Sequence, residues 1–186
     1  HNGTGFDALA KACEEKILNA NIALVITNNS NAQVVQKAQA KNIPNFILNQ
    51  NLYPSQNIDQ LILSKLLEFE CDYIFLSGYM KKIDDCIIQN FPHKIFNAHP
   101  ALLPKFGGAG MYGKYVHEAV INAGETTSGV TIHEVNEEYD EGKIIVQKSL
   151  LLDENETAQS LEQRIKELEK IAIVEAFQKI LGANNE

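Results

Sequence analysis

The chain has 186 residues, of which 45% are hydrophobic and 22% are charged, proportions typical of an ordinary globular protein. Its length suits one well-packed domain, which we expect to span residues 1–186. The net charge of −8 argues against nucleic acid as a partner, because no basic face is available to neutralise phosphates. No apolar run approaches the ~20 residues of a membrane span, so we expect no membrane partner.

The first residues form a run of small side chains, Asn2 to Gly5, in front of a helical pattern that extends from Phe6 to Ile17. Free N–H groups and the helix dipole make such a loop a site for an anion. A loop of this kind normally follows a parallel strand. We therefore expect a first strand before residue 1, outside this sequence.

Apolar runs rich in β-branched residues alternate with helical patterns through the rest of the chain. We predict strands at 22–27, 44–48, 72–76 and one ending at 95–96, and helices at 32–40, 56–70, 81–91, 115–123 and 157–181. This alternation predicts an α/β fold with parallel strands and right-handed crossovers. The runs 126–134 and 144–147 are separated by a short acidic turn, so these two strands should pair antiparallel.

The segment after the strand that ends at 95–96 carries the most specific chemistry. Asn97 and His99 are two residues apart on an extended chain, so their side chains point to the same side. Pro100 and Pro104 keep a helix from starting and stiffen the segment. An amide that donates to an oxyanion would then stand beside an imidazole that moves a proton. The alternative is an asparagine that caps a turn and a half-exposed loop histidine.

Two further stretches should reach the same edge of the sheet, because ligands of open α/β sheets lie beyond the carboxyl ends of the strands. The glycine-rich run 105–113 is either a surface loop or a lid beside the site. Asp140, in the acidic turn 137–142, would raise the pKa of His99 and hold its ring. The alternative for Asp140 is a solvated turn residue.

These motifs together resemble the folate-dependent formyltransferases. The resemblance covers the chain to about residue 181 and rests on Asn97, His99, Pro100, Leu102, Leu103, Pro104, Asp140 and Gly142. Within the family, the sequence Gly-Met-Tyr-Gly at 110–113 looks like that of members acting on glycinamide ribonucleotide (GAR), whereas the methionyl-tRNA members continue differently. The resemblance implies a three-layer α/β/α formyltransferase fold, Rossmann-like, with a mostly parallel twisted sheet and one antiparallel strand near the C-terminal part.

The resemblance also implies an activity. The chain would transfer the formyl group of N10-formyltetrahydrofolate to the amine of GAR, a one-carbon transfer in purine biosynthesis that uses no metal. Asn97 and His99 would stabilise the oxyanion of a tetrahedral intermediate, with His99 as general acid and Asp140 supporting it. The sequence contains no Gly-x-Ser-x-Gly motif, which favours direct transfer over a covalent acyl-enzyme.

Other contacts carry over by position from the family. The acceptor substrate would be held by Asn2, Gly3, Thr4, Gly5, Gly78, Met80, Lys166 and Glu169. The folate would be held by Met80, Lys81, Lys82, Ile83, Asn97 and Asp140. Thr131 and His133 would support the site from behind. His133 is equally a core residue by pattern, and Lys166 is equally a solvated helix charge.

The segment that ends the motif should contain an unusual peptide bond. We expect the bond between Leu103 and Pro104 to be cis, because the chain must reverse sharply there and related formyltransferases carry a cis proline at this point.

Neither the histidines nor the cysteines show metal-ligand spacing, so we expect no metal site. His93 and His117 should be surface residues. The three cysteines leave one thiol over and indicate a reducing, cytoplasmic compartment: Cys13, Cys71 and Cys86.

Two other functions share parts of the pattern. A formyltetrahydrofolate hydrolase has the same motif but usually carries an N-terminal regulatory domain. A catalytically silent nucleotide-binding module could use the same scaffold. The presence of Asn97, His99 and Asp140 together favours the transferase, which would act on small molecules as a monomer or homodimer.

Overall fold

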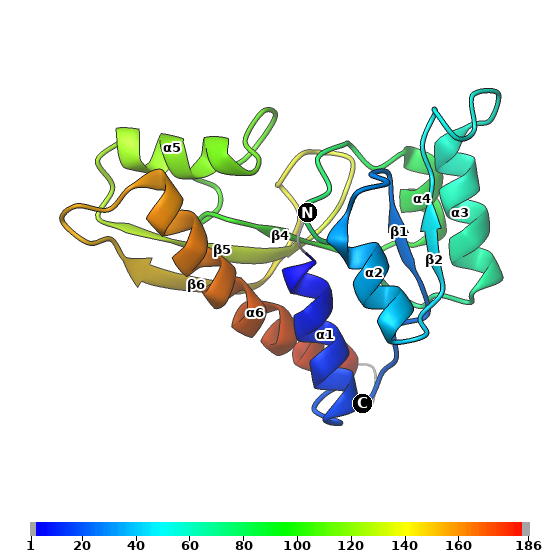
Figure 1. The fold of residues 1–186 in the computed structure, drawn as a ribbon. Helices are drawn as coiled ribbons and strands as arrows, with labels where there is room; N and C mark the ends of the chain where they lie inside the picture. Colours follow the sequence, from blue (N-terminus) through cyan, green and yellow to red (C-terminus); the bar gives the residue numbers. More distant parts are fainter. Residues whose placement is uncertain (1–2, 184–186) are drawn as a thin grey trace.

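The computed structural model describes residues 3–183, and Figure 1 shows an α/β fold in which the strands lie between helices. The elements in chain order are α1 (Thr4–Glu14), β1 (Val25–Thr27), α2 (Gln33–Ala40), β2 (Asn45–Ile47), α3 (Ile58–Glu68), β3 (Ile74–Leu76), α4 (Asp85–Asn90), β4 (Ile95–His99), α5 (Lys114–Asn122), β5 (Thr127–Glu134), β6 (Ile144–Leu151) and α6 (Ala158–Gly182).

The described strands form two sheets. β3, β4, β5 and β6 lie side by side in one sheet, and β1 pairs with β2 in the other. β1 with β2 and β3 with β4 run parallel, whereas β5 is antiparallel to both of its neighbours. This confirms the α/β fold with one antiparallel strand and the antiparallel pairing of the last two strands. β1, β2 and β3 are short and half-buried, and within residues 3–183 each of them has one edge without a neighbouring strand.

Alternation along β4 sends its side chains into two different cores. Phe96 packs with Phe177 of α6 in a cluster that also contains residues of α1, β5 and β6. Ile95, one residue earlier, packs on the opposite face with α3 and α4. The larger sheet is thus covered by helices on both faces. Asn97 and His99 share the face of Ile95, as their spacing predicts.

Several helix ends differ from the periodic pattern. α1 stops at Glu14, because Lys16 has a φ of 59° that an α-helix cannot continue, and Ile17 is exposed rather than buried. α4 begins only after Asp84, whose carboxylate caps its first turn. Ile171 of α6 is exposed although its spacing predicts a core position. None of the helices in residues 3–183 combines the length and the apolar character needed to cross a membrane.

A buried polar network holds the segment after β4 against β5. The hydroxyl of Thr131 accepts a hydrogen bond from the N–H of Leu103 (3.1 Å) and donates to the carbonyl of Ala101 (2.7 Å). The amide of Gln147 donates to the Leu103 carbonyl and to the Thr131 hydroxyl. The peptide bond between Leu103 and Pro104 is cis, as predicted.

We expect Thr131→Val to lower the free energy of unfolding by about 1–3 kcal/mol, because a buried N–H and a buried carbonyl lose their partner while the side-chain volume is kept. Urea unfolding followed by circular dichroism measures this change. Ser128→Ala on the same strand is the control. The buried hydroxyl of Ser128 has no hydrogen-bond partner among the described residues, so its removal should leave stability unchanged or raise it. Equal losses in both variants would contradict the assignment.

Candidate active site

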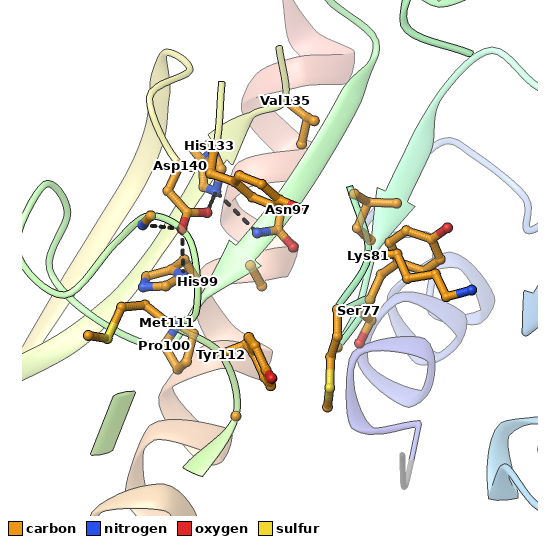
Figure 2. Close-up of a pocket in the computed structure, with 18 of the residues that line it drawn as sticks. Ser77, Lys81, Asn97, His99, Pro100, Met111, Tyr112, His133, Val135 and Asp140 are labelled. Carbon is orange, nitrogen blue, oxygen red and sulfur yellow. Dashed lines mark hydrogen bonds and ion pairs between the residues drawn. The ribbon is translucent and has the colours of Figure 1, made fainter. Parts of the chain in front are cut away.

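A cleft of about 630 Å³ opens at the carboxyl ends of β3 and β4, the edge at which the sequence places the site. Figure 2 shows Asn97, His99 and Asp140 on one wall of this cleft. Ser77 and Lys81, which follow β3, lie on the opposite wall. Segments far apart in the sequence therefore face each other across it.

β4 continues to His99 rather than ending at residue 96. From Phe96 to His99 it pairs with the antiparallel strand β5. Asn97 lies opposite His133, and His99 lies opposite Thr131. The Asn97 Nδ2 group donates to Nε2 of His133 (3.2 Å), and Nδ1 of His133 donates to the carbonyl of Glu134 (2.9 Å). This arrangement places the proton of a neutral His133 ring on Nδ1 and leaves the second N–H of the Asn97 amide for a ligand.

The imidazole of His99 is enclosed by protein. Only 3% of this residue is exposed, so the alternative of a half-exposed loop histidine is wrong. Its Nε2 atom donates to the carbonyl of Phe106 (2.7 Å), and its Nδ1 atom lies 3.5 Å from Oδ2 of Asp140. Both ring nitrogens face acceptors, so the protonated ring finds a partner at each nitrogen.

The carboxylate of Asp140 joins the two histidines, as Figure 2 shows. Its Oδ2 atom accepts a hydrogen bond from the N–H of Gly108 (2.9 Å) and faces His99, while Oδ1 lies 3.4 Å from Nε2 of His133. The backbone of Asp140 has a φ of 57°, a left-handed conformation that aspartate tolerates better than most residues. Asp140 is therefore part of the cleft wall rather than a solvated turn residue.

Burial and charge act in opposite directions on the ionisation of this pair. Burial lowers the pKa of His99 and outweighs the negative charge of Asp140, which alone would raise it. Asp140 thus raises the pKa of His99 as expected, but the pKa is lowered overall, because the ring loses more hydration than one carboxylate replaces. Burial raises the pKa of Asp140, but the contacts with His133, His99 and the Gly108 N–H together hold that pKa below its ordinary value. At neutral pH Asp140 is ionised and His99 is mainly neutral.

The turn that carries Asp140 is closed at its base. The N–H of Glu134 donates to the carbonyl of Lys143 (2.9 Å), and a side chain at position 142 would run into the carbonyl of Glu134. Glycine is required at this close approach. Gly142 therefore has a steric role in the motif.

The glycine-rich run 105–113 supplies two backbone groups to the site, the carbonyl of Phe106 and the N–H of Gly108. The sequence places this run near the site, but it does not identify these groups, because backbone atoms carry no residue signature. Residues 108–113 also line the cleft, so the run is more than a surface loop.

Most of the other predicted contact residues line the same cleft. They are Gly3, Thr4, Gly78, Met80, Lys81, Lys82, Ile83, His133, Lys166 and Glu169. Gly5 is not among them, because it is buried in the first turn of α1 against Ser77 and Phe75. Asn2 lies outside the described residues. The roles of all these residues in binding stay predictions. Within residues 3–183, no three histidine, cysteine or acidic side chains gather in a way that could hold a metal ion.

Helices α5 and α6 bring further polar side chains to the cleft. Lys166 donates to the carboxylate of Glu162 (2.6 Å), so it is not an isolated solvated charge. Burial raises the pKa of Glu169 to about 7 despite the nearby positive charge of Lys166. His93 is exposed as predicted, but His117 is buried and lines the cleft, so the prediction of a surface position is wrong. The spacing of four residues between Glu162 and Lys166 is the one sequence signal for this pair.

The fold and this wall of amide, imidazole and carboxylate point to a single class of enzyme. The chain belongs to the formyl transferase family, which it matches over residues 1–177. It is 35% identical over 185 residues to a phosphoribosylglycinamide formyltransferase from Bacillus subtilis. The aligned region covers 99% of this chain and 92% of that protein. The crystal structure of phosphoribosylglycinamide formyltransferase from Bacillus halodurans is similar with a TM-score of 0.88 at 30% identity, over 97% of this chain and 91% of that one.

A more distant enzyme shares the fold. The crystal structure of a formyltetrahydrofolate deformylase from Pseudomonas syringae has a TM-score of 0.83 to this chain, over 94% of this chain and 56% of that one. Its sequence identity is 20%, a likeness that shows the fold alone. The predicted membership of the formyltransferases is confirmed by the family match.

We expect Asp140→Asn to lower the pKa of His99 further, because the substitution removes the negative charge that opposes the effect of burial. The ring resonances of His99, followed by NMR through the pH range in which imidazoles titrate, measure this shift. Glu141→Gln removes the same charge from an exposed neighbouring side chain and should leave the His99 pKa unchanged. An unchanged pKa in Asp140→Asn would show that the two groups are not coupled.

Proposed function

We propose that this chain transfers the formyl group of N10-formyltetrahydrofolate to the amine of GAR, a step of purine biosynthesis, in the cytoplasm and without a metal. One observation carries the proposal. Asn97, His99 and Asp140 converge on one wall of one cleft, in a member of the formyl transferase family. The chain is also similar to a GAR formyltransferase over nearly the whole length of both proteins, which supports the same acceptor.

The reaction requires two proton movements and one acyl transfer. The amine nitrogen of GAR attacks the formyl carbon, and the carbonyl oxygen becomes the oxyanion of a tetrahedral intermediate. The bond from the carbon to N10 of the folate then breaks, so that formyl-GAR and tetrahydrofolate separate. The amine loses a proton and N10 gains one. Much of the rate acceleration comes from holding the two substrates together.

Asn97 is suited to the oxyanion. One N–H of its amide is bonded to His133, which fixes the orientation of the amide. The second N–H is a neutral donor that can meet the negative charge as it develops. A donor that is already oriented needs no reorganisation during the reaction, which is why such groups lower the barrier.

His99 is suited to moving the proton. Because burial lowers its pKa, the ring is mainly neutral at pH 7. Its proton is then on Nε2, bonded to the Phe106 carbonyl, so Nδ1, beside Asp140, is the atom that can accept the proton that the amine loses. The ionised carboxylate of Asp140, 3.5 Å from Nδ1, then stabilises the imidazolium. His99 next gives the proton to N10 as tetrahydrofolate leaves. In this account His99 acts first as a base and then as an acid, rather than as a permanently charged acid.

The two substrates would occupy different parts of the cleft. The folate ring would lie along residues 80–83, which line the cleft across from Asn97. The phosphate of GAR would lie at Gly3 and Thr4, where the N-terminus of α1 favours negative charge. Lys166 would add a positive charge at that end.

Formation of formyl-GAR from N10-formyltetrahydrofolate and GAR is the direct test, with a reaction lacking GAR as its control. We expect folate turnover only when GAR is present. Turnover of the folate without acceptor would favour a hydrolase instead. Absence of turnover under both conditions would favour a nucleotide-binding module.

We expect His99→Gln and Asp140→Asn each to lower kcat by ~10²-fold or more, with a smaller change in KM, because each removes a group that acts on protons in the transition state. Steady-state kinetics with both substrates measures this. His93→Gln changes an exposed histidine near the start of β4 and should retain normal kcat. Near-normal kcat in both of the first two variants would show that their roles are misassigned.

A further inference from the structure

His117 is a buried titratable side chain that the mechanism above does not use. It lies on α5 one turn before Val120, which packs with Leu161 and Ile165 of α6. Only 3% of His117 is exposed, and the residue lines the cleft. Its Nδ1 atom has no hydrogen-bond partner among the described residues. A buried polar atom without a partner is rare and calls for an explanation.

Charged groups close to His117 identify that partner. Burial lowers the pKa of His117, the negative charge of Glu162 opposes this, and the charges of Lys166 and His99 add to it. Glu162 and His117 also line the same cleft, from α6 and α5 respectively. In this structure, however, the carboxylate of Glu162 accepts a hydrogen bond from Nζ of Lys166 (2.6 Å).

Lys166 has a second use in the proposed function. It is the lysine of α6 that lines the acceptor end of the cleft, with Glu162 one turn before it on the same helix. A phosphate carries more negative charge than a carboxylate and offers more acceptor oxygens, so it competes effectively for an ammonium group. When a phosphate binds Lys166, Glu162 loses its partner, while Nδ1 of His117, on the lining of the same cleft, already has none among the described residues.

We propose that Glu162 changes its hydrogen-bond partner from Lys166 to His117 when the phosphate of the acceptor substrate binds Lys166. Before binding, Glu162 is paired with Lys166 and Nδ1 of His117 is unpaired. After binding, Lys166 is paired with the phosphate and Nδ1–H of His117 donates to Glu162. The exchange gives each of these groups a partner, including the buried Nδ1 atom of His117, which favours the bound state. The inference rests on the proposed function, because it needs an acceptor that carries a phosphate. His117 is then a positioning residue that acts through Glu162 and Lys166.

Two substitutions at position 117 separate hydrogen bonding from packing. His117→Leu removes the donor and keeps an apolar side chain, whereas His117→Asn keeps an N–H donor near the position of Nδ1. We expect His117→Leu to raise the Kd of GAR about tenfold, measured by calorimetry without folate, and to leave kcat within about twofold. We expect the Kd of His117→Asn to stay within about threefold of the unmodified chain. Equal losses of affinity in both variants would overturn the proposal.

The same substitution in a second background tests the coupling. In Glu162→Ala the acceptor of the proposed hydrogen bond is absent, so adding His117→Leu should change the Kd of GAR no further. A tenfold loss that persists in this background would show that His117 acts by packing alone, and it would overturn the exchange.

A measurement on the unmodified chain decides the matter if His117→Leu does not fold. On saturation with GAR, the Nδ1 resonance of His117 should shift in NMR spectra, and its proton should exchange more slowly with water, as a new hydrogen bond requires. An unchanged His117 ring in a chain that forms formyl-GAR would overturn this inference and leave the proposed function intact. A chain that neither binds nor formylates GAR would overturn the proposed function itself.

Discussion

A negative charge that is held away from water has to be met by donors on several sides, and the carboxylate of Asp140 is such a charge. It accepts a hydrogen bond from the N–H of Gly108 in the glycine-rich run, and the rings of His99 from β4 and His133 from β5 lie 3.5 and 3.4 Å from it. β4, the glycine-rich run and β5 are thus brought together around one pair of oxygen atoms. The shape of the cleft wall depends on these contacts, because losing any one of them would leave the Asp140 carboxylate with fewer polar neighbours.

β4 connects this charged centre to the hydrophobic core. Its side chains alternate between Ile95, Asn97 and His99 on one face and Phe96 on the other, which packs under α1 and α6. A shift of β4 by one residue would put Phe96 in the cleft and the polar side chains in the core. The packing that stabilises the sheet therefore also keeps the face that carries Asn97 and His99 in place, and Thr131 does the same for the segment that follows β4.

Local patterns were sufficient to predict most of the strands and helices, the antiparallel pair at the end and the common side of Asn97 and His99, since these depend on residue periodicity and short turns. The features that could not be predicted depend on distances in the folded chain. The pKa of His99 follows from how deeply it is buried, and the Phe106 carbonyl reaches it only through the path of a loop. His117 looks like any helix-surface histidine until α5 packs on α6.

The closed base of the turn after β5 has a consequence for how this protein can change in evolution. The hydrogen bond from Glu134 to Lys143 and the tight fit of Gly142 make residues 135–142 a loop with a fixed perimeter. Exchanging one side chain for another within the loop alters what the cleft offers to a ligand. An inserted or deleted residue would instead move Asp140 along the perimeter, away from His99, even though β5 and β6 still pair. During evolution, side chains at this edge of the cleft can therefore be substituted, but the loop cannot change in length without displacing Asp140.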